Sequence, residues 1–162
     1  SYNNSEVTFM FKNKFKKIIA ALAVVAIVGS AAPSMSQAAS YHTNAISVAK
    51  ANMGVKYKWG GITPKGFDCS GLIKYSYGKA GKTLPRTAAD MYKLSGKKVN
   101  GMSSLAPGDI MFFGPNKASK PTHAAIYLGK GQMIHAATSK GVSTTSTSNT
   151  YWKPKFIGAK RL

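Results

Sequence analysis

The chemistry of this chain centres on one residue, because Cys69 is the only cysteine among its 162 residues. A lone cysteine forms no intramolecular disulfide, which leaves core packing, an intermolecular bridge or a reactive thiol. Cys69 lies between Asp68 and Ser70, and two polar neighbours suit a cleft better than a hydrophobic core. Asp68 is also a typical helix N-cap, so we expect Cys69 in the first turn of a helix, where free N–H groups favour a thiolate.

A nucleophilic thiol needs a general base within hydrogen-bond reach, and the base needs a partner that orients it. The chain has three histidines, His42, His123 and His135. His42 lies just after a predicted signal peptide that ends at Ala38, and it is predicted to be exposed and to have no catalytic role. His123 and His135 fall in two adjacent predicted strands, so they are the candidates for the base and its partner.

The turn between these two strands decides whether the histidines can meet. The loop Gly129-Lys130-Gly131 predicts a hairpin, in which the numbers of opposed residues have a constant sum. With Lys130 at the centre of a three-residue loop the sum is even, and His123 and His135 are diagonal neighbours on one face, about 7–8 Å apart at the backbone. A two-residue loop would make the sum odd and place the two rings on opposite faces.

A zinc site is the alternative use of Cys69, His123 and His135, because three protein ligands and an open position are typical of catalytic zinc. The sequence lacks a short ligand pair such as HExxH or CxxC. We therefore favour nucleophilic catalysis, with no metal and no cofactor. A third interpretation is that the cysteine packs in the core and each histidine is an ordinary strand residue.

The pattern of apolar and turn-forming residues places helices first and an antiparallel sheet afterwards, which is an α+β arrangement. Helices are predicted at 43–52 (capped by Thr43 or Asn44), 69–79 and 87–94. Strands are predicted at 109–113, 123–128, 132–138, 142–147 and 156–161. The segment 143–150 is rich in serine and threonine, and its composition suits an exposed strand and loop.

The N-terminal region has the three parts of a secretory signal peptide. Lysines at 12–17 precede an apolar run of 11 residues at 18–28, and small residues follow up to Ala38. This run is too short to span a membrane, which takes about 20 residues. We predict cleavage after Ala38, so that 1–38 are upstream residues and signal peptide and 39–162 form one catalytic domain. Residues 1–9 carry no targeting pattern, and Met10 is a candidate start.

The charge balance is strongly positive, with 23 Lys and Arg against 4 Asp and Glu, a net charge of +19. Charge of this size says little about the fold but favours binding to polyanions. For a secreted protein we expect anionic cell-wall polymers rather than nucleic acid as partners. We also expect no membrane anchor after signal cleavage, and a monomer.

Six segments resemble the NlpC/P60 family of cell-wall endopeptidases, in the family's order and over nearly all of 51–162. They are Tyr57-Lys58-Trp59-Gly60-Gly61, Phe67-Asp68-Cys69-Ser70-Gly71-Leu72-Ile73, Leu84-Pro85-Arg86-Thr87, Pro107-Gly108-Asp109-Ile110-Met111-Phe112-Phe113, Thr122-His123-Ala124-Ala125-Ile126-Tyr127-Leu128-Gly129 and Ile134-His135-Ala136. The chain departs from the family at Asp90 and Met91, where members often carry Gln nearby, and at Ala124-Ala125, where Val-Gly is more usual. These departures bear on substrate preference rather than on the type of reaction.

The resemblance implies a papain-like fold, with N-terminal helices packed on an antiparallel sheet of about five to six strands. It also implies a secreted peptidoglycan hydrolase that cuts γ-D-glutamyl–diamino acid bonds in stem peptides through a thioacyl intermediate. Cys69 would be the nucleophile, His123 the base and His135 the residue that orients His123. Tyr57 and the backbone N–H of Cys69 would stabilise the oxyanion, and the candidate substrate contacts are Asp68, Ser70 and Arg86.

Two other functions remain open from the sequence. A CHAP-type N-acetylmuramoyl-L-alanine amidase also uses Cys and then His, but its third residue is usually acidic or Asn, and no acidic residue follows Asp109 here. A non-enzymatic cationic cell-wall-binding protein would be indicated by a decayed catalytic set, whereas Cys69, His123 and His135 are all present. Both comparisons favour the endopeptidase.

Overall fold

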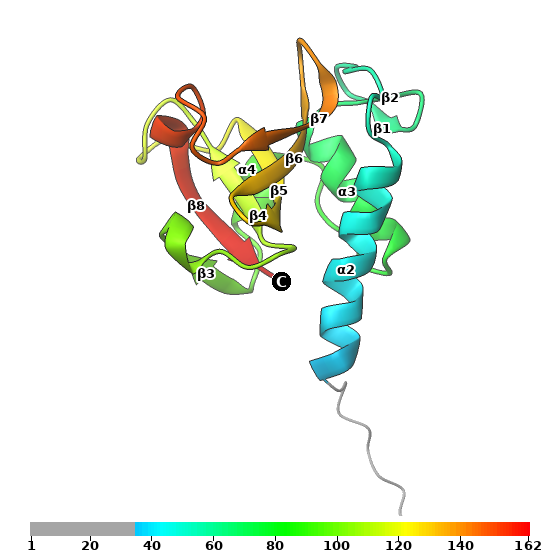
Figure 1. Ribbon diagram of the computed structural model, residues 1–162, viewed down its shortest axis with the longest axis horizontal. Helices are drawn as coiled ribbons and strands as arrows, with labels where there is room; N and C mark the ends of the chain where they lie inside the picture. The colour runs from blue at the N-terminus through cyan, green and yellow to red at the C-terminus, as the bar shows by residue number, and fades with distance from the viewer. Residues whose placement is uncertain (1–34) are drawn as a thin grey trace, which may run out of the picture. The chain divides into compact units, whose positions relative to one another are not determined.

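The computed structural model describes residues 35–162, with side chains from residue 41 onward (Figure 1). Residues 1–34, which hold most of the predicted signal peptide, lie outside the described residues. The predicted cleavage point, Ala38, falls within the first described helix, α2 (Met35–Ala51). The signal peptide and the division at Ala38 therefore stay predictions. No helix in the described part of the chain is both long enough and apolar enough to cross a membrane.

Two further α-helices follow α2, and both begin with a side-chain cap. They are α3 (Cys69–Lys79), capped by Asp68, and α4 (Ala88–Tyr92), capped by Thr87. The predicted bounds of α3 are confirmed, whereas α4 is shorter than predicted. The predicted start of α2 is wrong: Thr43 and Asn44 lie inside the helix, because the alanine-containing residues before them continue it at little cost.

One antiparallel sheet of six strands carries the site, in the order β3-β8-β4-β5-β6-β7. Its strands are β3 (Lys97–Val99), β4 (Ile110–Phe113), β5 (His123–Gly129), β6 (Gln132–Ala137), β7 (Gly141–Ser146) and β8 (Phe156–Arg161). A separate hairpin joins β1 (Ile62–Thr63) to β2 (Gly66–Phe67). The α+β prediction is confirmed. The sequence analysis missed β1, β2 and β3, which are too short to show alternation.

The β5–β6 hairpin has the predicted even register but not the predicted loop. Ile126 lies opposite Ile134, and the register shifts between Tyr127 and Gly129, so that Gly129 lies opposite Gln132. Lys130 and Gly131 form the loop, with φ of 51° and 70°, the left-handed conformation that tight hairpin turns require. The expected three-residue loop is therefore wrong. A β-bulge next to a two-residue loop restores the even register, because it adds one residue to β5.

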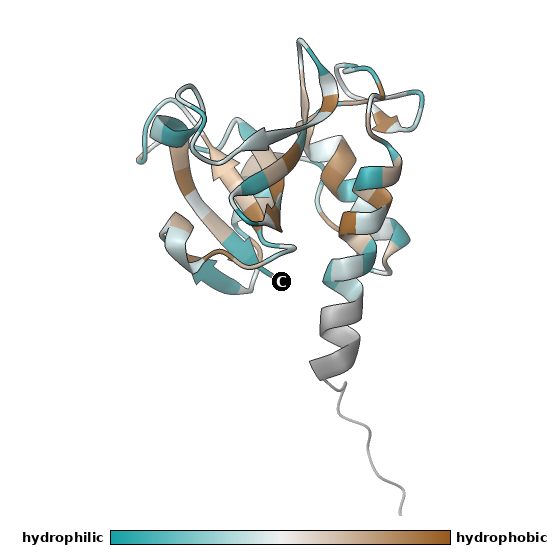
Figure 2. Cartoon of the chain, viewed as in Figure 1, coloured by the Kyte–Doolittle hydropathy of each residue, from teal (hydrophilic) through white to brown (hydrophobic). Residues whose placement is uncertain are grey.

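The sheet is apolar on both faces, and its strands alternate between two clusters. Ile110 and Phe112 of β4 pack with residues of α2 and α3, whereas Met111 and Phe113 pack on the other face. Figure 2 shows hydrophobic colour along the central strands and the inner side of α3, and hydrophilic colour on β3. By the same alternation His123 and His135 stand on the face of Phe113. Cys69, at the N-terminus of α3, approaches His123 at the beginning of β5.

Candidate active site

The Asp68 carboxylate fixes the position of Cys69 at the first turn of α3. Asp68 accepts a hydrogen bond from the N–H of Gly71 at 2.7 Å and from the N–H of Gly60 at 3.1 Å. The N–H of Asp68 donates to the carbonyl of Gly61 at 3.1 Å. A Cβ at Gly71 would lie 1.9 Å from that carbonyl oxygen, so only glycine allows the 60–61 turn to press against the helix.

The Cys69 thiol lies against the start of β5. Sγ is 4.0 Å from the carbonyl oxygen of Thr122, and the backbone N–H of Ala124 also reaches it. These two residues flank His123, so the candidate nucleophile and the candidate base approach each other where the strand begins. Burial is the main cause that raises the pKa of the Cys69 thiol, and the charge of Asp68 adds to it. The expected preference for a thiolate is therefore wrong at rest, because burial outweighs the N–H groups of the helix.

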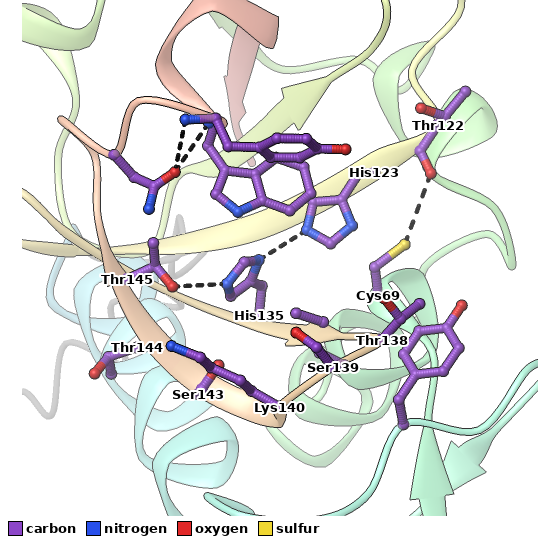
Figure 3. A pocket seen from close by; sticks show the side chains of 16 residues that line it. Cys69, Thr122, His123, His135, Thr138, Ser139, Lys140, Ser143, Thr144 and Thr145 are labelled. Atoms are coloured by element: carbon purple, nitrogen blue, oxygen red, sulfur yellow. Dashed lines mark hydrogen bonds between the residues drawn. The ribbon is translucent and has the colours of Figure 1, made fainter.

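The two imidazoles meet on the second face of the sheet. His123 Nε2 lies 2.8 Å from His135 Nδ1, and the ring centroids are 5.1 Å apart at an interplanar angle of 78°. His135 Nε2 lies 2.9 Å from Thr145 Oγ1. Figure 3 shows this row of side chains along one wall of a pocket, with Cys69 beside His123. His123 Nδ1 is the nitrogen left for the thiol proton.

Burial keeps both imidazoles neutral at physiological pH. It lowers the pKa of His123 to about 3, with a further contribution from the charge of His135, and it lowers the pKa of His135 to about 4. A protonated thiol beside a neutral imidazole is the starting state for general-base catalysis. The resting site is therefore a thiol and a base rather than an ion pair.

A pocket of about 720 Å³ opens over these residues (Figure 3). Its lining includes Cys69, His123 and His135, together with Tyr57. Hydroxyl side chains from the β6–β7 region form much of the wall: Thr138, Ser139, Ser143, Thr144 and Thr145. Lys140 is the only ordinarily charged side chain among the lining residues, all of which belong to the described part of the chain. The pocket thus combines a reactive thiol with a polar, acid-free wall.

Tyr57 reaches the pocket on a segment that is held from two sides. A parallel bridge pairs it with Phe67, and the N–H of Val142 donates to the carbonyl of Val55 at 2.9 Å. Gly141, at φ 65°, permits this contact, because a Cβ there would lie 2.2 Å from the Val55 oxygen. Burial raises the pKa of Tyr57, as do the charges of Cys69 and Asp68. Its hydroxyl therefore keeps its proton and can donate.

The other candidate substrate contacts form a cluster of their own. Arg86 binds both carboxylate oxygens of Asp68, at 3.0 and 2.5 Å, and reaches Ser70 Oγ at 2.9 Å. Asp68 and Ser70 are buried, and none of the three residues lines the pocket around Cys69. The bond to Arg86 and the two backbone N–H groups lower the pKa of Asp68, against the opposing effect of burial. Helix capping and anchoring of Arg86 thus occupy the carboxylate, and substrate contact by this cluster stays a prediction.

The comparisons with known proteins agree with this geometry. The NlpC/P60 family matches residues 54–161. The chain belongs to the NlpC/P60 family. It is 47% identical over 121 residues to the gamma-DL-glutamyl hydrolase of Bacillus subtilis strain 168, covering 72% of this chain and 29% of that one. The probable peptidoglycan endopeptidase LytE of the same strain is 46% identical over 116 residues, covering 72% and 33%. The chain thus spans about a third of the length of these relatives.

Solved NlpC/P60 structures share the fold. An NlpC/P60 protein from Bacillus cereus ATCC 10987 superposes with a TM-score of 0.69 at 28% identity, covering 74% of this chain and 39% of that one. The peptidoglycan hydrolase RipB from Mycobacterium tuberculosis gives 0.66 at 29% identity, covering 79% and 67%. The predicted papain-like architecture is confirmed by these NlpC/P60 neighbours.

Within this NlpC/P60 site, the sequence analysis missed Trp152. Its indole stacks on the His123 ring, with centroids 4.2 Å apart and planes 21° apart, and makes a T-shaped contact with His135, with centroids 5.4 Å apart. Asn149 holds the turn before it, because Asn149 Oδ1 accepts from the N–H groups of Tyr151 and Trp152 at 3.0 and 3.1 Å. Trp152 covers the bond between the two histidines. A lone Trp between a turn and a strand gave no signal of this role.

Two further expectations need correction. The predicted exposed segment 143–150 is wrong for Ser143 and Thr145, which are half-buried beside β6 and line the pocket, because β7 pairs with β6 along its whole length. His42 is not exposed: its Nε2 is buried, and its ring packs against Tyr41 and Tyr77. As for the zinc alternative, no group of three or more His, Cys, Asp or Glu among the described residues is placed to hold a metal ion.

Proposed function

We propose that this protein is a secreted cysteine endopeptidase that cuts γ-D-glutamyl–diamino acid bonds in the stem peptides of peptidoglycan. The observation that supports it most directly is the 2.8 Å contact between His123 Nε2 and His135 Nδ1 in the pocket that also holds Cys69. That contact leaves His123 Nδ1 facing the side of the thiol. A nucleophile, a base and an orienting group are the parts that thiol peptidases require.

The reaction begins with transfer of the Cys69 thiol proton to His123 Nδ1. The sulfur attacks the γ-glutamyl carbonyl carbon, and the oxyanion collapses to a thioester as the diamino acid amine leaves with the proton from His123. Water then loses a proton to His123 and attacks the thioester, which releases the new carboxylate and restores the thiol. Trp152 stabilises the transient imidazolium through its stacked ring, an effect of about 1–2 kcal/mol in a desolvated site.

The oxyanion would be held from two directions. The N–H of Cys69 lies in the first turn of α3, where helical N–H groups have no partner within the helix. The Tyr57 hydroxyl lines the same pocket and keeps its proton. One such donor contributes about 3–4 kcal/mol to transition-state stabilisation in other enzymes.

The relatives and the pocket wall support the substrate assignment. One relative is named a gamma-DL-glutamyl hydrolase and another a probable peptidoglycan endopeptidase. Stem peptides carry carboxylates, and the pocket offers Lys140 and hydroxyl groups but no carboxylate. The amidase alternative expects an acidic or Asn third residue, whereas His123 Nε2 contacts His135. These observations favour the endopeptidase.

The surplus of positive charge supports attraction to anionic wall polymers. Each of the three acidic residues in the described part of the chain is paired with a cation: Asp68 with Arg86, Asp90 with Lys93 and Asp109 with Arg161. Most lysines in this part of the chain therefore have no carboxylate partner and can bind polyanions outside the molecule. Release from isolated walls should rise steeply with salt; binding that is equally tight at high salt would refute this attraction.

Secretion to the cell wall belongs to the same proposal and rests on the predicted signal peptide with cleavage after Ala38. Mass spectrometry of the protein recovered from culture medium or wall extracts would test it. A mature N-terminus at Ala39 would support the proposal, and an uncleaved intracellular chain would refute it.

The activity is tested by incubating the mature protein with peptidoglycan beside its Cys69→Ala variant and reading the released fragments by mass spectrometry. Fragments that end in D-glutamate, absent with the variant, would establish the endopeptidase. Intact stem peptides with a free L-alanine amine would instead show an amidase. Retained binding without release by either protein would favour a wall-binding protein.

A further inference from the structure

The outer nitrogen of His135 has a partner that the mechanism above does not use. His135 is 1% exposed, and both of its ring nitrogens are engaged, Nδ1 with His123 and Nε2 with Thr145 Oγ1 at 2.9 Å. Figure 3 shows the three side chains in a row. A neutral imidazole has one donor and one acceptor nitrogen, so the hydrogen bond at one nitrogen decides the role of the other.

Two proton arrangements satisfy this row, and only one of them is productive. In the first, His135 Nε2–H donates to Thr145, His123 Nε2–H donates to His135 Nδ1, and His123 Nδ1 keeps a lone pair for the thiol proton. In the second, every donor is reversed and His123 Nδ1 already carries a proton. Burial keeps both rings neutral, so the tautomer of His135 decides which arrangement exists.

We propose that Thr145 is a positioning residue that holds His135 in the Nε2–H tautomer and thereby keeps His123 Nδ1 available as the base. This inference rests on the proposed cysteine peptidase mechanism. Thr145 lies opposite Met133 in the β6–β7 register, where His135 lies opposite Ser143, so the hydroxyl is diagonal to the imidazole on the same face. No acidic residue follows Asp109 in the chain, and a neutral hydroxyl performs the orienting task here.

Removal of the hydroxyl should favour the unproductive arrangement. Without an acceptor, His135 Nε2–H would be a buried donor with no partner, and orphaned N–H groups are rarer in proteins than under-satisfied acceptors. Moving the proton to Nδ1 avoids that cost, because Nδ1–H can donate to His123. His123 then carries its own proton on Nδ1 and cannot accept one from Cys69.

The experiment compares Thr145→Val with Thr145→Ser and with Thr147→Val, a matched loss of a hydroxyl two residues further on and outside the pocket lining. The histidine tautomers are read by ¹⁵N NMR of histidine-labelled protein, and Cys69 reactivity by the rate of alkylation with iodoacetamide across pH. Neither measurement needs peptidoglycan. kcat and KM on a stem peptide complete the set, and thermal unfolding confirms that each variant folds.

We expect His135 of the wild type to carry its proton on Nε2, and Thr145→Val to move it to Nδ1. Alkylation near neutral pH and kcat should fall by about 10- to 100-fold, the scale seen when the hydrogen-bond partner of a metal-binding histidine is lost, with KM little changed. Thr145→Ser should have the wild-type tautomer, alkylation rate and kcat. Thr147→Val should leave all three unchanged. A wild-type Nδ1–H tautomer, or a Thr145→Val protein with unchanged tautomer and kcat, would overturn the role. Absence of stem-peptide cleavage by a wild type with the Nε2–H tautomer would refute the proposed function instead.

Discussion

Two polar clusters flank Cys69, one made of neutral groups and the other of charged groups. On one side, His123, His135 and Thr145 form a row of neutral groups. On the other side, Asp68, Ser70 and Arg86 form a charged cluster in which the carboxylate has a bidentate cation and two backbone donors. Burial acts on both, but it keeps the histidines neutral, whereas Arg86 keeps Asp68 ionised.

This difference fits two different roles, proton transfer for the histidines and helix capping for Asp68. A base must gain and lose a proton during each turnover, so its resting state must be neutral. A helix cap must keep its charge under all working conditions, so it benefits from a fixed cation. In the proposed mechanism the histidine row therefore governs the rate of reaction, whereas the Asp68 cluster positions the thiol.

The largest effect is expected from His123→Ala. Loss of the base should reduce kcat by about 10⁶-fold, the scale seen when the general base of a serine peptidase is removed. The free energy of unfolding should also fall, because the change leaves a cavity beside Trp152 and an unpaired His135 Nδ1, but the larger effect is on the rate. Peptide cleavage and urea unfolding measure the two quantities. A variant that loses its fold, or keeps more than a tenth of its activity, would contradict the proposed division of roles between the two clusters.

Asp68→Ala should show the reverse balance. The change removes the cap of α3, worth about 1 kcal/mol, and an ion pair whose half-exposed Arg86 limits its contribution to about 1 kcal/mol. The free energy of unfolding should therefore fall by about 2 kcal/mol in urea titration. Asp68→Asn is the matched control, because its side-chain oxygen can still cap Gly71; it should recover about half of the loss.

The parts of the fold that local sequence rules determine were predictable. The start of α3 follows from Asp68, and β4 and β8 follow from their apolar residues. The placement of His123 and His135 on one face was also predicted, but from an expected three-residue loop. The structure instead has a tight turn at Lys130-Gly131 and a β-bulge in β5 that corrects the register and produces this placement.

The residues that sequence reasoning missed are those whose role depends on contacts distant in the chain. Thr145 and Trp152 reach the histidines from β7 and from the turn before β8, and neither has a local pattern that separates it from a surface residue. Thr145 becomes a candidate only when β7 is placed in register with β6. Motif matching identifies the proposed nucleophile and the proposed base, whereas the residues that support them can be found only from the order and register of the strands.

The pH dependence of stability should separate the two clusters. The folded-state pKa values of His123 and His135, about 3 and about 4, lie below the unfolded value near 6.5. Between about pH 6.5 and pH 4 the unfolded chain binds more protons, so the free energy of unfolding should fall as pH falls, by up to about 1.4 kcal/mol per pH unit for each histidine.

Urea titrations at several pH values above 4 would measure this slope, with the His123→Ala/His135→Ala double variant as control. The double variant should keep only a shallower slope, to which His42 contributes because burial lowers its pKa too. The pKa of the Asp68 carboxylate is lowered, so Asp68 should add to the slope only at pH values below the ordinary pKa of an aspartate, about 4. Equal slopes in both proteins would show that the histidine row is not held neutral by burial.

The smallest effect is expected from Trp152→Leu. Leucine keeps an apolar cover over the histidines but removes the aromatic face that stabilises the imidazolium of His123, a loss of about 1 kcal/mol or roughly fivefold in kcat. Trp152→Phe keeps an aromatic face and should lose less. The order Trp, Phe, Leu in kcat, with KM unchanged, would show that the ring acts on the charged intermediate. Equal losses in the Phe and Leu variants would instead mean that only the size of Trp152 matters. Trp152 would then act by covering the two histidines, and not by stabilising the imidazolium through its aromatic face.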